Sequence, residues 1–185
     1  IKDLIDKTKD NQSTSIVAKR VKRSEGPLFQ FLYLVHKTIT LIFTGKKINF
    51  GNYSCLRKKD VNVLVNQASL WSSFSGSVKK NLESLSEISS VRGIRYFGPS
   101  KMSLINLVLH SFSIIAVFKY IVFFRSALII VFLSFLIDQI GLIAIILQIL
   151  LIVFNLLIYT VSLRENVKEF AKSEENILNE NEILH

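Results

Sequence analysis

"LIAIILQILLIVFNLLIYTVSL", residues 142–163, is a nearly continuous apolar run. Its 22 residues include no Asp, Glu, Lys or Arg. A helix of this length is roughly 33 Å long, which is enough to cross the hydrocarbon core of a bilayer. A core helix of a globular protein would carry a polar stripe, but here only scattered polar residues interrupt the apolar run. The stretch therefore predicts a transmembrane helix.

A second apolar stretch precedes the first. Residues 120–137, "YIVFFRSALIIVFLSFLI", predict an 18-residue span of about 27 Å, with Arg125 close enough to its start to reach the headgroups. Residues 138–141 then form the turn. Because Lys and Arg lie before and after this pair of spans and not in the turn, the positive-inside rule places the turn outside and both termini in the cytoplasm. We therefore expect an integral membrane protein, in the cytoplasmic or inner membrane, whose two transmembrane helices occupy residues 120–163.

Residues 103–119 differ from the two spans. Asn106, His110 and Ser113 recur at helical spacing and form one polar stripe among Leu, Ile, Val and Phe. This pattern is typical of an amphipathic helix that lies in the plane of the membrane interface.

The charges divide the chain into three regions. Residues 1–102 carry 18 basic and 7 acidic side chains, a net charge of +11, whereas residues 103–163 carry +1 and residues 164–185 carry −3. We expect the last region to be an acidic cytoplasmic tail, frayed or disordered near its end. A strongly basic region beside an uncharged apolar one indicates an anionic partner at a membrane surface. Nucleic acid is a weaker explanation, because the basic residues lack the interleaved aromatic residues that stack on bases.

The basic region reads as an alternation of strands and helices, which indicates an α/β layer. The expected elements begin with the end of a helix in residues 1–10, a strand at "TSIVAKR" and a helix over 27–43 opened by Pro27. They continue with a strand and a Gly51-Asn52 turn in "KINFGNYSCL", a helix from Lys58, a helix over 68–81 and a strand in "SLSEISSVRGIRYFG".

Composition limits the remaining classes. A single cysteine, Cys55, excludes an internal disulfide framework and a cysteine-based zinc site. The chain begins with Ile, and its one methionine is Met102. We therefore expect a fragment of a longer protein, with an amino-terminal part outside this sequence.

A basic loop leads directly into the expected interfacial helix. Arg92, Arg95 and Lys101 flank Gly98 and Ser100, and Lys101 lies two residues before the helix. Arg offers a planar fork and Lys a compact charge to phosphate oxygens, Ser100 adds a hydroxyl donor, and Gly98 lets the backbone approach a ligand. The loop therefore predicts binding of a phosphate whose lipid tail lies along the adjacent helix.

The segment "RGIRYFGPSKMSLINLVLHSFSIIAVF" resembles family 2 glycosyltransferases, in which an R-x-x-R-x-x-G-x-S-K/R motif leads into interfacial and transmembrane helices. Polyprenyl-phosphate glycosyltransferases, including dolichyl-phosphate mannose synthase-like enzymes, share this arrangement. "VAKRVKRSEG" is similar to the A-x-R-x-x-R-x-E segment of the family, and "LWSSFSGSV" stands at the place of its Trp-containing acceptor-side helix. The resemblance covers nearly all of residues 14–163.

The resemblance implies that residues 1–102 are the carboxy-terminal part of a GT-A, Rossmann-like domain on a membrane anchor. Such enzymes move a sugar from a nucleotide sugar to a lipid-phosphate or other membrane-associated acceptor, with Mg²⁺ or Mn²⁺ on the diphosphate, and a homo-oligomer is compatible with this picture. The metal ligands would lie outside this sequence, in the Asp-x-Asp half of the family. The resemblance places the donor side at Arg20 and Arg23, an acceptor turn at Gly51, Asn52 and Ser54, and the phosphate site at Arg92, Arg95, Ser100 and Lys101.

One departure leaves the acceptor open. Asn52 stands where lipid-phosphate enzymes of the family commonly have Asp, and an Asn cannot act as a general base. A phosphate acceptor is already ionised near neutral pH, since its second pKa is about 6, whereas a sugar hydroxyl would need a base. The sequence therefore assigns no catalytic residue. The alternative is a non-enzymatic two-span membrane adaptor whose basic cytoplasmic face binds anionic lipid or protein. An upstream Asp-x-Asp would decide for the enzyme.

Overall fold

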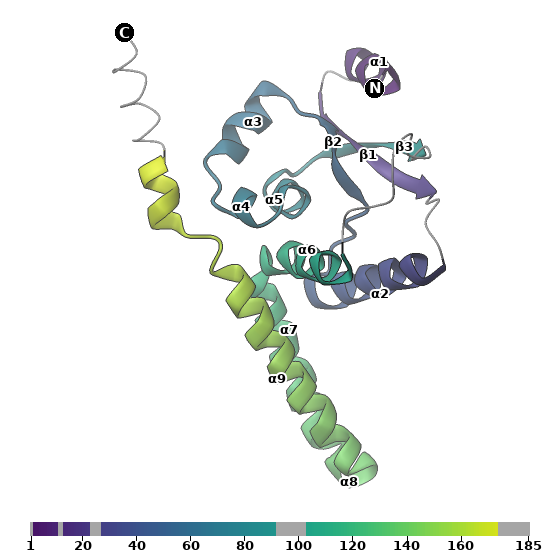
Figure 1. The fold of residues 1–185 in the computed structure, drawn as a ribbon, viewed down its shortest axis with the longest axis vertical. Coiled ribbons are helices and arrows are strands. Elements are labelled where there is room, and N and C mark those ends of the chain that lie inside the picture. The colour runs from purple at the N-terminus through teal and green to yellow at the C-terminus, as the bar shows by residue number, and fades with distance from the viewer. Residues whose placement is uncertain (1, 11–12, 23–26, 92–102, 174–185) are drawn as a thin grey trace.

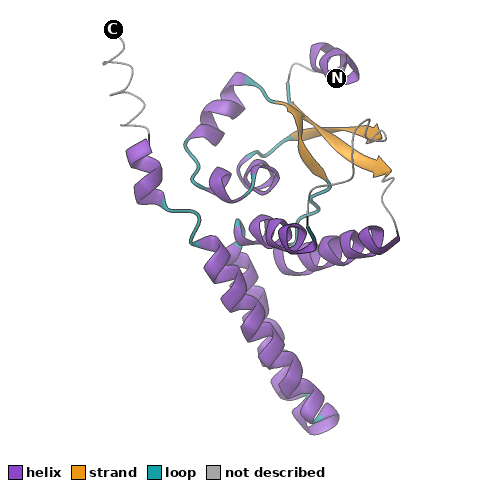
Figure 2. Cartoon of the chain, viewed as in Figure 1, coloured by secondary structure: helices purple, strands orange, loops and turns teal. Residues whose placement is uncertain are grey.

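The structure is a computed structural model, and it describes residues 2–10, 13–22, 27–91 and 103–173 (Figure 1). A three-stranded sheet with its helices forms one end of the molecule, and two long helices extend away from it. The predicted mixed α/β class is confirmed (Figure 2).

The sheet has the order β2-β1-β3. The central strand β1 (Ser15–Lys22) pairs antiparallel with β2 (Phe50–Cys55) and parallel with β3 (Leu85–Val91). Alternate residues of β1 face opposite sides, as the pleat requires. Val17 packs into the larger core with residues of α3 (Lys58–Val65) and α5 (Phe74–Asn81), while Ile16 and Ala18 pack with Leu4 of α1 (Lys2–Asp10). Helices therefore cover both faces.

The predicted Gly51-Asn52 turn is wrong, because both residues lie within strand β2. Val17 pairs with Ser54 and Lys19 with Phe50, so a step of two residues on β1 faces a step of four on β2. The extra residues of β2 form an irregularity in an edge strand, where a glycine is well tolerated. The Gly-Asn pair thus marks a bulge.

The helix predicted over residues 68–81 is present but divided. α4 (Ser69–Ser72) and α5 are separated by Ser73, whose backbone is extended (φ −159°, ψ 123°). The Ser73 hydroxyl accepts a hydrogen bond from the amide of Gly76, so Ser73 caps the amino terminus of α5. A serine that bonds the backbone locally competes with helix continuation, which explains the break.

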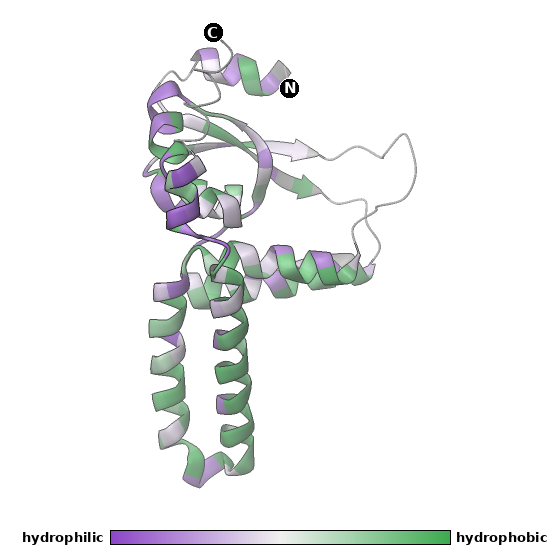
Figure 3. Ribbon diagram, turned by 60° about the vertical axis from the view of Figure 1, so that its left-hand side comes forward, coloured by the Kyte–Doolittle hydropathy of each residue, from purple (hydrophilic) through white to green (hydrophobic). Residues whose placement is uncertain are grey.

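Two helices lie under the sheet and cross the sheet-facing ends of the two long helices (Figure 3). They are α2 (Pro27–Thr44) and α6 (Leu104–Ala116), and both agree with predicted helices. Phe154 of the last long helix contacts Phe43 of α2 and Phe112 of α6, with ring centroids 4.6 and 6.0 Å apart. The polar stripe of α6 is divided: Asn106 and His110 are exposed, but Ser113 is buried.

The long pair consists of α7 (Lys119–Phe135) and α9 (Leu142–Ser162), joined by α8 (Ile137–Ile140) and Gly141, which has φ +53°. They lie side by side (Figure 3). Across this contact the Gln148 side-chain amide donates to Ser134 Oγ (2.9 Å) and to the Ile130 carbonyl (3.2 Å). The helix bounds agree with the two predicted apolar stretches.

By length and composition, the described part of the chain contains one helical stretch able to cross a membrane, Leu142–Ser173. Only 11% of its most apolar window is buried within the protein. α6 and α7 pass the same test only together, and the chain bends by 91° between them. Of the acidic tail predicted over residues 164–185, the structure describes residues 164–173, and residues 174–185 lie outside the described ranges.

Candidate functional site

Most of the predicted site residues lie in or next to segments that reach one end of the sheet. At this end the parallel strands β1 and β3 both finish. Lys22 of β1 is paired with Val91 of β3, so the two strands end side by side. Arg23 follows Lys22 in the sequence, and Arg92 follows Val91. The donor-side and phosphate-binding segments predicted from sequence therefore both begin at this carboxyl end of the sheet. Ligand sites of open α/β sheets form beyond the carboxyl ends of parallel strands.

Strand β2 contributes to the same end. Since β2 is antiparallel to β1, its first residue, Phe50, pairs with Lys19 near the end of β1. The bulge residues Gly51 and Asn52 follow, and Asn52 is exposed. Ser54 is set back, because it pairs with Val17 in the middle of the strand. Of the predicted acceptor residues, two lie towards the carboxyl end of the sheet and the third lies behind them.

The basic residues of the predicted site are described only in part. Arg20 lies in β1, where its backbone pairs with Ser90 of β3. The remaining predicted residues of the donor side and the phosphate site fall outside the described residues: Arg23, Arg92, Arg95, Ser100 and Lys101.

The carboxylates of the sheet region have structural partners. Glu87 pairs with Lys19 at 3.3 Å, with both side chains more than a third exposed, so this surface pair contributes little. Asp60 accepts a 2.5 Å hydrogen bond from the buried hydroxyl of Ser15, which also accepts one from the amide of Arg57. These bonds fix α3 against the start of β1. Among the residues that the structure describes, no group of three or more His, Cys, Asp or Glu could hold a metal ion.

The helices under the sheet expose apolar side chains. On α2 the positions of the exposed apolar residues fall on one face of the helix. α6 exposes a second apolar set, which includes Ile105 at 72%. The exposed apolar residues are Leu28, Phe31, Leu34, Leu41 and Ile42 on α2, and Leu104, Ile105, Val108 and Leu109 on α6. The sequence predicts an interfacial helix only at residues 103–119, whereas exposed apolar side chains occur on both α2 and α6.

Two sets of polar contacts hold these helices on the long pair. At the bend between α6 and α7, Lys119 Nζ lies 3.3 Å from Glu165 Oε2, Arg164 donates to Ser113 Oγ, and Lys80 donates to the Val117 carbonyl. At the end of α2, Arg125 of α7 donates to the Ile42 carbonyl at 2.7 Å. Arg125 thus binds the protein itself at a helix carboxyl terminus, where a cation is favourable.

The comparisons with known proteins identify no relative: no family model, curated protein or solved structure matches the chain.

Proposed function

We propose that the chain is the acceptor-side and membrane-anchoring part of a family 2-like glycosyltransferase, which moves a sugar from a nucleotide sugar to a lipid phosphate. In this proposal α7 and α9 both cross the membrane as a hairpin, α2 and α6 lie in its cytoplasmic interface, and the α/β layer is the second part of a GT-A domain. The sequence resemblance and the arrangement of the sheet end support the proposal together.

The observation that carries the proposal is the paired ending of β1 and β3 above two apolar helices. The Lys22–Val91 pair places the start of both arginine-bearing segments at one sheet end, and those segments lead in sequence to α2 and α6. A lipid phosphate needs cationic donors at the membrane surface and an apolar path beside them. In this proposal the arginine-bearing segments supply the cationic donors, and the exposed apolar side chains of α2 and α6 supply the apolar path.

The proposed chemistry is a single displacement at the anomeric carbon of the donor sugar. The acceptor phosphate oxygen forms the new bond while the bond to the nucleoside diphosphate breaks. Arginine side chains stabilise the negative charge that develops on the leaving diphosphate. The lipid phosphate is ionised near neutral pH and needs no general base, which accommodates Asn52 at the sheet end.

In the described part of the chain, no group of three or more His, Cys, Asp or Glu could hold Mg²⁺ or Mn²⁺. We therefore assign no step of the reaction to a metal held by this part of the chain. The family resemblance places the ligands of such a metal in the Asp-x-Asp half.

The proposal predicts that Arg95→Ala in the complete enzyme costs far more activity than Lys46→Ala, although each removes one positive charge. A phosphate contact at the membrane surface is partly desolvated, so its loss should cost on the order of 2–4 kcal/mol, or roughly 30- to 1,000-fold in rate. Lys46 is exposed in the turn after α2, where screening leaves little at stake. The measurement is sugar transfer from labelled nucleotide sugars to lipid extract by membranes that contain equal amounts of each variant.

Arg95→Lys serves as the second arm of this experiment. It should restore only part of the activity, because a point charge cannot reproduce the bidentate geometry of a guanidinium. Equal activity of Arg95→Ala and Lys46→Ala would show that the loop is only a solvated basic face. If the wild-type chain bound anionic vesicles but transferred no sugar, the membrane adaptor would be favoured instead.

A further inference from the structure

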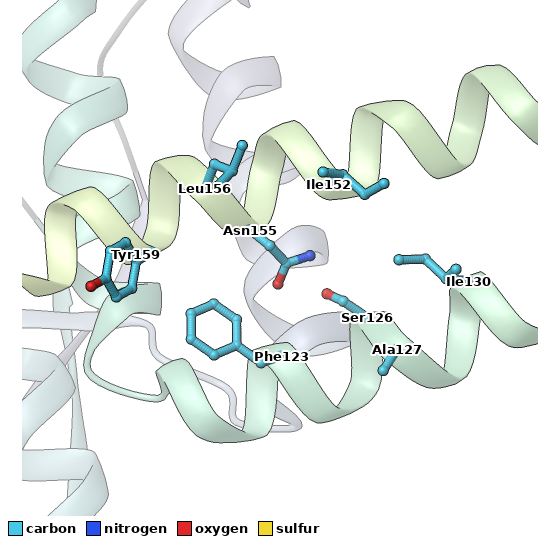
Figure 4. Close-up of a pocket in the computed structure, with 8 residues that line it drawn as sticks. All are labelled: Phe123, Ser126, Ala127, Ile130, Ile152, Asn155, Leu156 and Tyr159. Carbon is cyan, nitrogen blue, oxygen red and sulfur yellow. The ribbon is translucent and has the colours of Figure 1, made fainter.

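An open groove of about 350 Å³ runs between α7 and α9 (Figure 4). Phe123 and Tyr159 line its end towards the sheet, and Ile130 and Ile152 line the opposite end. Ser126 of α7 and Asn155 of α9 lie at its centre. No side chain that lines this α7–α9 groove is charged.

The two central polar side chains have unmet hydrogen-bonding capacity. Ser126 is 1% exposed, and its Oγ has no partner among the described residues. Asn155 donates from Nδ2 to the Leu151 carbonyl at 2.7 Å, but its buried Oδ1 accepts no hydrogen bond from any described group. The neighbouring polar contact of the same helices, between Gln148 and Ser134, is satisfied. An unmet polar atom in an apolar environment is costly, so a bound group that pairs with both atoms would be favourable here.

We propose that the α7–α9 groove binds an uncharged long-chain alcohol lipid, with its hydroxyl between Ser126 and Asn155. A hydroxyl supplies one acceptor for the Ser126 O–H and one donor for Asn155 Oδ1, which matches both unmet atoms. The hydrocarbon chain would lie along Ile130 and Ile152. The inference rests on the proposed membrane placement of α7 and α9, and it adds a second lipid site to the phosphate site of the proposed function.

The geometry disfavours the other occupants. A water molecule takes up about 30 Å³ in the liquid, so one water would leave most of the groove empty, and the apolar walls offer no partners for more. A phosphate-bearing headgroup would meet no cation at the centre of the groove. Close approach of a second helix favours small residues on both walls, whereas the α9 wall presents Ile152, Leu156 and Tyr159.

The centre of the α7–α9 groove lies about halfway along α7. Ser126 lies seven residues after Lys119, the first residue of α7, which corresponds to about 10 Å along the helix. Lys119 and Arg125 lie on the side towards the sheet, and Arg125 is directed to α2. Ser126 is thus the eighth of the 17 residues of α7 and lies close to the middle of that helix.

The test uses the purified full chain in phospholipid nanodiscs and three photoactivatable diazirine probes: hexadecanol, its methyl ether, and the parent alkane. The alkane reports whether α7 and α9 contact lipid at all. We expect the alcohol to label the groove roughly threefold to tenfold more than the ether, since the ether cannot donate to Asn155 Oδ1. Asn155→Leu should reduce this preference severalfold, Ser126→Ala should lower labelling by the alcohol and by the ether alike, and the matched control Ser134→Ala should change neither.

The outcomes separate the site from the membrane placement. An alkane that labels neither helix would overturn the membrane placement and with it this site. Alkane labelling with equal alcohol and ether labelling of the wild-type chain would overturn this site alone, as would equal effects of Ser126→Ala and Ser134→Ala. Oxidative crosslinking of two Asn155→Cys chains at high yield would assign the groove to a second copy of the chain. The probe comparison on the wild-type chain remains decisive if Asn155→Leu does not fold.

Discussion

At the scale of single residues, the contact between Lys119 and Glu165 holds the bend of α6 and α7 against the chain that leaves α9. The Lys119 side chain is 21% exposed and that of Glu165 only 8%. Glu165 Oε1 has no hydrogen-bond partner within the described ranges, so the carboxylate depends on Lys119 for its charge compensation. Removing one member of such a pair leaves a buried charge unpaired, which is more costly than removing both.

This dependence predicts that Lys119→Met destabilises the protein by about 2–3 kcal/mol, after a discount for the partial exposure of the lysine. Lys119→Met combined with Glu165→Leu should recover most of that loss. Thermal unfolding of the purified chain in detergent measures both effects, with the exposed Lys172→Met as the control. If Lys119→Met and the control unfolded at the same temperature, the ion pair would not stabilise the protein.

At the scale of elements, the end of α2 is matched to α7. The amide of Gly45 donates to the Leu41 carbonyl at 2.8 Å, and Gly45 has φ +69°, as expected for a glycine that terminates a helix. A Cβ at Gly45 would lie 2.7 Å from Nη2 of Arg125. The glycine therefore serves both the backbone of α2 and the guanidinium that donates to Ile42.

We expect Gly45→Ala to cost about 1–2 kcal/mol from the positive φ, together with part of the Arg125–Ile42 hydrogen bond. In an Arg125→Ala background the alanine no longer displaces a guanidinium, so its cost should fall by about 1 kcal/mol. A double-mutant cycle of unfolding free energies measures this coupling. Strict additivity of the two changes would mean that α2 is held to α7 without Arg125.

The elements also show what the sequence could predict. The helix over 27–43 and the two apolar stretches were predictable, because their periodicity and hydrophobicity are local properties of the chain. The Gly51-Asn52 bulge was not, since it depends on which residues of β1 face β2. The break at Ser73 depends on a single hydroxyl that bonds Gly76. The unmet atoms of Ser126 and Asn155 became visible only when α7 and α9 were packed together.

At the scale of the whole molecule, the two proposed sites depend on one proposed arrangement. In it, α2 and α6 hold the α/β layer on the cytoplasmic face, and α7 and α9 cross the bilayer. Every proposed site follows from it. The phosphate loop needs the interface beside α6, and the lipid alcohol needs the groove between α7 and α9. By length and composition the stretch Leu142–Ser173 is able to cross a membrane, and α7 packs against α9.

The most direct test is the accessibility of single cysteines in a Cys55→Ser background in intact cells. Gln139 and Asn166 are both exposed and lie at opposite ends of α9. We expect an impermeant thiol reagent to label Gln139→Cys from outside, and to label Asn166→Cys only after the membrane is permeabilised. Labelling of both positions from outside, or of Asn166→Cys alone, would contradict the arrangement of the whole molecule.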